Sequence, residues 1–286
     1  MRYTFIAAHE VQFQIKRMCK VLGVHRSGYY AWRHRTPSTR EQANQALLAL
    51  IKAEHQASRK TYGSPRLHAV LRRKGVACGH NRVARLMQLN GIVAAKRHPY
   101  HPVTTQRQPG VVPAPNLLDQ DFSASAPNQK WVSDFTYIET GEGWLYLAAV
   151  LDLFSRKVIG WAMSQTMDTA LVETALRMAL QGRQPPAGLL HHSDQGSQYT
   201  SSAYRTCLIA AQAQLSMSGV GNCYDNAVIE SFFGTLKTEC ATGPFITCAQ
   251  ARTTIFEYLE VWYNRQRLHS TLGYRSPVDF ENQLSL

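Results

Sequence analysis

Residues 130–139 read KWVSDFTYIE, a stretch in which aromatic and β-branched side chains alternate with polar ones. Such alternation is typical of a β-strand whose two faces meet different surroundings. Two more strands are expected at 144–153 and 157–163, and the short connections between the three predict an antiparallel meander. Asp134 stands in the middle of the first strand, where a charge is costly unless it is paired or binds a metal.

After the meander, helices and short strands are expected to alternate. The expected elements are helix 169–180, strand 189–192, helix 202–212, strand 214–217, and helices 227–239 and 249–264. The Gly-rich stretch SGVGNCYDN at 218–226 is expected to be a loop, with Asp225 and Asn226 capping the helix after it. This order of elements is that of a ribonuclease H-like α/β domain, with a mixed sheet in which βα units follow the three-strand antiparallel meander.

Charge is divided unevenly along the 286 residues, whose net charge is +12. Residues 1–110 carry +17 and residues 111–286 carry −5. A basic N-terminal part and an acidic C-terminal part indicate a polyanion-binding module joined to a part that uses carboxylates. The six cysteines show no C-x-x-C spacing, which indicates reduced thiols rather than a disulfide framework or a zinc site.

Targeting to a membrane is not expected. The longest apolar run, at 145–151, is far shorter than the ~20 residues that cross a bilayer. The N-terminus lacks the apolar core of a signal peptide. We therefore expect a cytoplasmic protein.

The basic part is expected to be helical. A helix at 11–22 closed by Gly23, and a second helix capped by Ser27, resemble a helix-turn-helix; the alternative is a helical hairpin with no DNA role. Three more helices are expected at 41–58, 64–75 and 80–90, the middle one capped by Ser64. The proline-rich stretch that follows is expected to be a linker. The expected domains are a short helical or helix-turn-helix segment at 1–40, a helical DNA-binding domain at 41–96, a linker at 97–125 and a catalytic core at 126–286.

Outward-facing side chains of the second group of helices are candidates for DNA contacts. A recognition helix meets the major groove near its N-terminal end, and Arg and Lys neutralise phosphates. A solvated basic helix face is the alternative. The candidates are Arg66, Arg72, Arg73, Lys74, Asn81, Arg82 and Arg85.

Three carboxylates stand where catalysis could use them. Asp134 is in the first strand, and Asp194 lies where the apolar run LLHHSD ends in the polar turn QGSQ. The carboxyl end of a strand is where ligands bind in α/β sheets. Glu230 lies on a helix whose other positions are mostly apolar, and 35 residues separate it from Asp194.

With this spacing the sequence resembles the D,D(35)E transposases and retroviral-type integrases. It most closely resembles the second-frame transposase of the bacterial insertion-sequence family numbered three. The matching stretches are WVSDFTYI around Asp134, HHSDQGSQYTS around Asp194, GNCYDNAVIESFFGTLKTE around Glu230, and YNRQRLHSTLGYRSPVDF at 263–280. The upstream segment TYGSPRLHAVLRRKGVACGHNRVARLM looks like the helix-turn-helix of these proteins.

The resemblance implies metal-dependent cleavage and transfer of DNA strands. It implies that Asp134, Asp194 and Glu230 hold two Mg²⁺ ions, with Mn²⁺ able to replace them and Asp134 as the bridging ligand. Hard cations prefer carboxylate oxygens, and two ions ~3.5–4 Å apart activate the nucleophile and stabilise the leaving oxygen. Lys237, two helical turns after Glu230, is implied to contact DNA near the cleaved phosphate; the alternative is an ordinary surface lysine.

Two arginines near the C-terminus, Arg265 and Arg267, have two interpretations. Either they bind the phosphate backbone, or they fix the C-terminal turn to the core. Arg267, His269 and Tyr274 also offer the residue types of a tyrosine recombinase, but they crowd within eight positions and cannot surround a phosphate from separate elements.

The resemblance also implies partners. They are the ends of the element and its target DNA, further copies of the chain in a dimer or higher oligomer on DNA, and a first-frame protein with a helix-turn-helix and a leucine zipper, or its fusion with this chain. The expected location is the bacterial cytoplasm, at the nucleoid. Alternative functions are a metal-dependent ribonuclease H and a transposase-derived DNA-binding or regulatory protein whose catalysis has lapsed.

Overall fold

A five-stranded sheet forms the centre of the computed structural model, which describes residues 1–95, 113–219 and 223–283. In chain order the strands are β1 (Lys130–Thr140), β2 (Gly143–Asp152), β3 (Val158–Ser164), β4 (Leu190–Ser193) and β5 (Gln214–Met217). Their spatial order is β3-β2-β1-β4-β5: the first three pair antiparallel, whereas β4 and β5 continue the sheet in parallel beyond β1. The expected ribonuclease H-like mixed sheet is confirmed.

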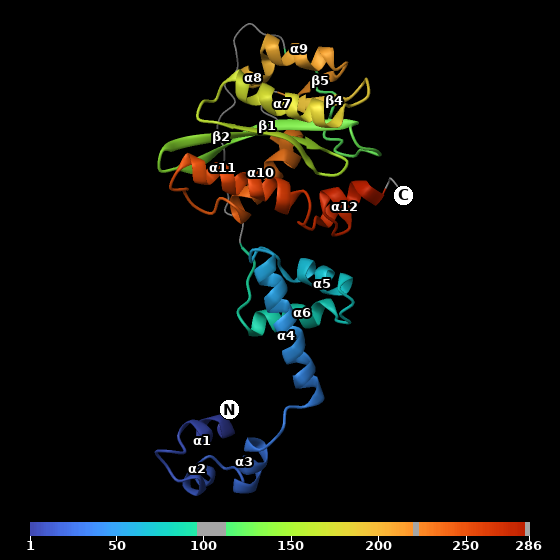
Figure 1. Ribbon diagram of the computed structural model, residues 1–286. Helices are drawn as coiled ribbons and strands as arrows, with labels where there is room; N and C mark the ends of the chain where they lie inside the picture. The colour runs from blue at the N-terminus through green and yellow to red at the C-terminus, as the bar shows by residue number, and fades with distance from the viewer. Residues whose placement is uncertain (96–112, 220–222, 284–286) are drawn as a thin grey trace.

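Helices cover both faces of the sheet (Figure 1). On one face lie α7 (Thr169–Arg183), α8 (Ser197–Thr200) and α9 (Ser202–Ala210); on the other lie α10 (Ala227–Glu239), α11 (Cys248–Glu257) and a π-helical turn, Tyr258–Tyr263. Successive strand residues point to opposite faces, so Trp131 joins one apolar cluster and Val132 the other.

The N-terminal part contains helices and no strand among its described residues. Its helices are α1 (Arg2–Ala8), α2 (Ile15–Val21), α3 (Arg26–Arg33), α4 (Thr39–Ala57), α5 (Ser64–Arg73) and α6 (His80–Leu89). Two expected caps are wrong, because the helices begin earlier than expected. His25, not Ser27, precedes α3, and Gly63, not Ser64, precedes α5, in both cases without a side-chain cap. Ser38 instead forms a capping box with Glu41 at the start of α4.

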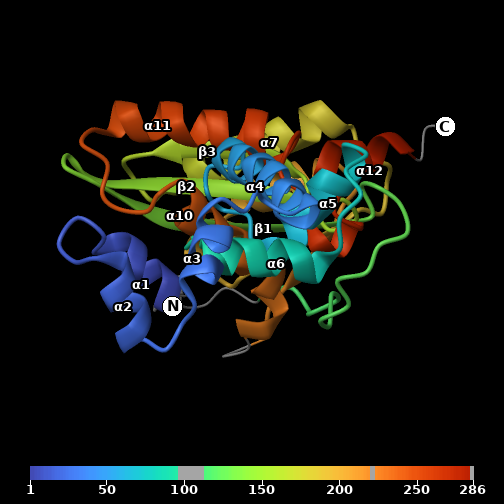
Figure 2. The same cartoon turned by 90° about the horizontal axis from the view of Figure 1, so that it is seen from below.

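Helices α4–α6 lie on the side of the sheet domain that carries α10 and α11 (Figures 1 and 2), and buried residues of both parts belong to one apolar cluster. The contact centres on buried Tyr62, whose hydroxyl accepts a hydrogen bond from the Leu268 backbone N–H at 2.7 Å and whose ring lies 5.8 Å from that of Trp262. Arg59 Nη2 pairs with Glu257 Oε1 at 2.7 Å beside it. A hydroxyl that accepts from a buried backbone N–H fixes orientation as well as distance. These contacts hold α4–α6 at a defined position on the core.

The chain after β5 contains elements that local patterns did not predict. A 3₁₀ turn, Cys223–Asn226, replaces the end of the expected loop, and residues 220–222 lie outside the described residues. Asn226 precedes α10 but makes no side-chain cap, so the expected capping role is wrong. Most of the expected linker also lies outside the described residues. No helix of the described part is long and apolar enough to span a bilayer.

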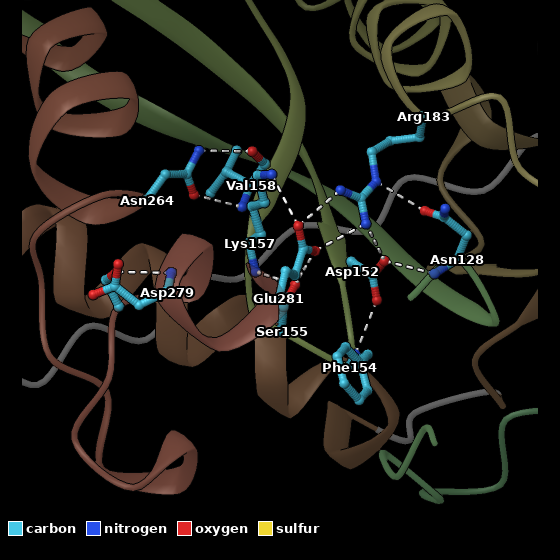
Figure 3. A network of polar contacts seen from close by, with 11 residues as sticks. Asn128, Asp152, Phe154, Ser155, Lys157, Val158, Arg183, Asn264, Asp279 and Glu281 are labelled. Atoms are coloured by element: carbon cyan, nitrogen blue, oxygen red, sulfur yellow. Dashed lines mark hydrogen bonds and ion pairs between the residues drawn. The ribbon is translucent and has the colours of Figure 1, made fainter. Parts of the chain in front are cut away.

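A network of charges fastens the C-terminal helix α12 (Pro277–Asn282) to the sheet (Figure 3). Glu281 accepts hydrogen bonds from Arg183 at 2.8 and 2.9 Å, from Ser155 at 2.7 Å and from Lys157 at 2.9 Å. Arg183 also pairs with the fully buried Asp152 at 3.2 Å. Burial by itself raises the pKa of Glu281, but the donors from Arg183, Ser155 and Lys157 outweigh it and lower the pKa.

We predict that Glu281→Gln lowers the free energy of unfolding by about 2 kcal/mol, because it removes the counter-charge of half-buried Lys157 and one of the two counter-charges of Arg183, which keeps Asp152. Urea unfolding at neutral pH measures this. The folded pKa of Glu281 is lowered, so its contribution is present above its unfolded pKa and is lost as pH falls through the folded value. As a control, Glu173→Gln removes an i,i+4 pair with the exposed Arg177 and costs less than about 0.5 kcal/mol. Equal losses in the two variants contradict the assignment.

Candidate active site

Two neighbouring parallel strands bring Asp134 and Asp194 together. The register between β1 and β4 runs from Lys130 opposite Leu190 to Ser133 opposite Ser193, so the two aspartates are the next residue of each chain. Adjacent strands lie about 4.8 Å apart. The two aspartates therefore stand at the same level of neighbouring strands where β4 ends, and Asp194 lies at a strand end, as its position after LLHHS predicted.

Local hydrogen bonds orient both aspartates. Asp134 Oδ1 accepts the Phe135 backbone N–H at 2.8 Å, and Asp194 Oδ1 accepts that of Gly196 at 2.9 Å. Gly196 lets the Asp194 side chain approach the turn, because a Cβ there would lie 2.9 Å from Asp194 Oδ1 and 3.2 Å from Gln198 Oε1 and would displace one of these side chains. Both carboxylates are half-buried.

The third carboxylate, that of Glu230, lies on α10, which packs against β1. The apolar face of α10 is formed by the buried side chains Ile229, Phe232, Phe233 and Leu236. Glu230 is exposed in the first turn, where the helix dipole favours an anion. Lys237 follows seven residues later, which places it on the same side of the helix.

The three carboxylates and Lys237 share one electrostatic field. Burial, then Asp194 and more weakly Glu230, raise the pKa of Asp134 well above its ordinary value, while Phe135 N–H and Lys237 act against them. Burial lowers the pKa of Lys237 to about 8, although Asp134 favours its charged form. A concentration of negative charge around Asp134 is what a bound cation would relieve.

The donor set fits a hard divalent cation in its chemistry, since all three candidates are carboxylates. Among residues 1–95, 113–219 and 223–283, no group of three or more His, Cys, Asp or Glu side chains is arranged so that it could hold a metal ion as it stands. Asp134, Asp194 and Glu230 thus influence one another through charge and do not form a closed coordination shell in this structure.

The two histidines before Asp194 are part of the core. His191 Nε2 is hydrogen-bonded to Ser133 Oγ at 2.8 Å and to Tyr204 Oη at 3.1 Å, and His192 bonds Ser216 and Ser218. Burial lowers the pKa of His191 to about 3 and that of His192 to about 4, so both are neutral at pH 7. Their imidazoles stabilise the sheet beneath the carboxylates.

The candidate DNA contacts on α5 and α6 divide by exposure. Arg72, Arg73, Lys74, Asn81 and Arg85 are exposed, with Lys74 paired to Glu54 at 2.5 Å. Arg66 and Arg82 are half-buried, and both contact other residues of the same domain. Arg82 donates to Asn44 Oδ1 at 2.8 Å, and the Arg66 guanidinium lies 5.6 Å from the Tyr62 ring centroid.

Arg267 belongs to the interior and not to a DNA-facing surface. Only 4% of its surface is exposed, and it forms a bidentate pair with Glu239 at 2.8–3.0 Å. This arrangement corrects the expected DNA contact in favour of the alternative, in which the arginine fixes the C-terminal turn to the core. Arg265 is exposed, and its Nε donates to the Glu260 carbonyl at 3.1 Å.

Asp225 has a different role from the expected helix cap. Its buried carboxylate instead accepts hydrogen bonds from Asn116 Nδ2 at 3.0 Å and from the Gly219 N–H at 3.2 Å. It thereby ties the segment before β1 and the end of β5 to the start of α10. Asn116 lies 109 positions away, so no local pattern could reveal this role.

Comparisons with known proteins cover nearly the whole chain. Two models described as the integrase core domain match residues 124–223 and 211–277, and an HTH-like domain model matches 42–100. The transposase InsF for insertion sequence IS3A of Escherichia coli K12 is 46% identical over 99% of both chains. An uncharacterized 31 kDa protein of insertion element IS600 from Shigella sonnei is 45% identical over 93% of this chain and 98% of that one. A chain in the intasome of simian T-cell lymphotropic virus is 15% identical, with a TM-score of 0.47 over 81% of this chain and 74% of that chain.

We predict that Asp134→Asn raises the stability of the metal-free protein by about 1 kcal/mol, because it removes a charge that burial and Asp194 disfavour and keeps the acceptor for Phe135 N–H. The raised folded pKa means that the gain is absent below the unfolded pKa of aspartate and grows as pH rises through the folded value. Thermal unfolding in EDTA at several pH values measures it. A loss of stability at neutral pH would rule out the assigned repulsion.

Proposed function

This chain belongs to the IS3 family of insertion-sequence transposases, with an integrase core, and we propose that it cuts and joins DNA strands at Asp134, Asp194 and Glu230. The observation that carries the proposal is the placement of Asp134 and Asp194 at the same level of adjacent parallel strands, beside the helix that carries Glu230. The shifted pKa of Asp134 supports it, since this carboxyl responds to both of the others.

We propose that these carboxylate oxygens would hold two Mg²⁺ ions, or Mn²⁺ in their place. Bound there, the ions would supply the activation of water or of a 3′-hydroxyl and the stabilisation of the leaving oxygen. Asp194, with one oxygen held by the Gly196 N–H, follows β4, and Asp134 lies on β1, which contacts both β4 and α10. Glu230, exposed in the first turn of α10, would complete the set.

We propose Lys237 as the ligand of the DNA phosphate. It is half-buried, on the side of α10 that carries Glu230, and close enough to Asp134 for their charges to interact. With a pKa of about 8, the ammonium is mostly protonated at pH 7. We propose that it holds the DNA phosphate next to the carboxylates and offsets part of the negative charge that the substrate brings.

We further propose the division of labour expected from the sequence. Residues 41–96 bind DNA through the exposed side chains of α5 and α6, and residues 126–286 form the catalytic core. The buried contact of Tyr62 with Leu268 supports a fixed distance between the two, so DNA bound to α4–α6 would reach the carboxylates in a defined register. The two ends of the insertion element must meet for strand transfer, so the proposal includes a dimer or higher oligomer of this chain on DNA. It also includes the first-frame protein as a partner.

We predict that Glu230→Gln lowers metal-dependent strand cleavage and transfer by more than about 100-fold, because it keeps the side-chain shape and removes a metal-ligating charge. Gel assays on DNA that carries the ends of the element, with Mg²⁺ or Mn²⁺, measure both steps. The assay is run with and without the first-frame protein, which separates a missing partner from inactive chemistry.

Glu139→Gln is the matched control. Glu139 is an exposed glutamate on β1, so the same change there removes a charge outside the site and leaves activity within about twofold of the natural chain. Full activity of Glu230→Gln contradicts the proposed site. A natural chain that binds DNA, with its partner, but never cuts it supports the lapsed transposase instead.

For the DNA-binding helices we predict that Arg72→Gln/Arg73→Gln weakens binding of any duplex sequence. Each lost phosphate contact reduces the slope of log K against log salt by about 0.9, so the pair reduces it by about 1.8. Fluorescence anisotropy between ~50 and ~200 mM salt measures the slope. Arg177→Gln, an exposed arginine of α7, is the control and leaves it unchanged. An unchanged slope in the double variant means that α5 does not face the DNA.

A further inference from the structure

Helices α1–α3 form a small unit with a core of its own. Ile6, Met18, Cys19 and Tyr29 make an apolar cluster separate from the two clusters of the sheet. In Figure 1 the unit lies at the end of the molecule opposite the sheet, with α4 between them. It precedes the 42–100 match to the HTH-like domain, and the proposed function gives it no role.

The second and third helices of this unit are joined as in a helix-turn-helix. After α2 ends at Val21, Gly23 takes the left-handed conformation with φ 61°, and Val24 N–H bonds the Cys19 carbonyl at 3.0 Å to close the turn. Helix α3 begins three residues after Gly23. A short Gly turn between two packed helices is the frame in which the second helix can enter a major groove.

Each of these helices presents a polar face away from the small core. On α3, buried Tyr29 points inward, and Ser27 and Tyr30 lie on the exposed side with Arg26 at its N-terminal end. On α2, buried Met18 points inward, and Lys16 and Lys20, one turn apart, lie opposite it. The exposed faces therefore combine a helix with hydrogen-bonding side chains and a second helix with two cations.

The charge of the unit is almost entirely positive. Residues 1–35 contain seven Lys and Arg and a single carboxylate, Glu10. The Glu10 carboxylate is paired within the unit: it accepts a hydrogen bond from Tyr29 Oη at 2.9 Å and forms an ion pair with Arg33. The six remaining cations are exposed and form no ion pair with any other residue that the structure describes; they are Arg2, Lys16, Arg17, Lys20, Arg26 and Arg35.

We propose that α1–α3 is a second duplex-DNA-binding unit of this chain, in which α3 enters a major groove through Arg26, Ser27 and Tyr30 while Lys16 and Lys20 contact phosphates. The inference rests on the proposed function, because it takes DNA as the substrate. An unpaired cationic surface on a helix-turn-helix frame matches a polyanion and repels an equally basic second copy. With α4–α6 in the same chain, the two units engage one duplex with higher joint affinity than either alone.

The test compares full-length variants on a fluorescein-labelled duplex of random sequence, about four helical turns long. Lys16→Gln/Lys20→Gln is expected to bind severalfold more weakly, with the salt slope reduced by about 1.8. Lys16→Arg/Lys20→Arg keeps both charges, and Arg177→Gln removes one from the core, so both are expected to bind like the natural chain. Circular dichroism confirms that each variant is folded.

Natural affinity and an unchanged salt slope in Lys16→Gln/Lys20→Gln overturn the proposal. A change in the sedimentation coefficient of that variant without a change in DNA binding also overturns it, and assigns α1–α3 to a protein contact. The Arg72→Gln/Arg73→Gln variant, measured on the same duplex, reports on the proposed function separately. If it loses binding while the lysine variant does not, only the second unit is rejected.

Discussion

The parallel pairing of β1 with β4 is the constraint on which the site depends. It sets Asp134 and Asp194 at the same level of neighbouring strands, and the cost of that proximity appears as the raised pKa of Asp134. Two carboxylates that repel each other in a half-buried place are stable only because the rest of the sheet determines the register. The neutral His191 and His192, each satisfied by hydroxyl partners, secure β4 directly beneath them.

The elements after the sheet position Glu230 and connect α4–α6 to the core. Buried Asp225 fixes the start of α10, and Arg267 with Glu239 fixes its end to the C-terminal turn. The next residue, Leu268, donates its backbone N–H to Tyr62 of the helical domain. One continuous set of buried contacts therefore runs from α10 to the helices that are proposed to bind DNA.

Local patterns predicted the strands, most helices and the three candidate carboxylates, because hydrophobic periodicity, turn residues and the spacing of the acids can be recognised in short stretches of sequence. They failed where a side chain's partner is distant. Arg267 looked like a phosphate ligand because Glu239, which neutralises it, lies 28 positions earlier. Asp225 looked like a cap for the same reason, and Ser27 and Ser64 because helix ends vary by one or two residues. The roles of Asp134, Asp194 and Glu230 stay predictions.

The central claim is that Asp134, Asp194 and Glu230 act together on a divalent cation. Its most direct test is an anomalous difference map from crystals of the full chain grown or soaked with Mn²⁺. The account predicts density between the carboxylates of Asp134 and Asp194, with Glu230 drawn toward it, and loss of that density in Glu230→Gln or its reduction to a single weak peak. A well-ordered site with no manganese at saturating concentration, or manganese bound only elsewhere, would contradict it.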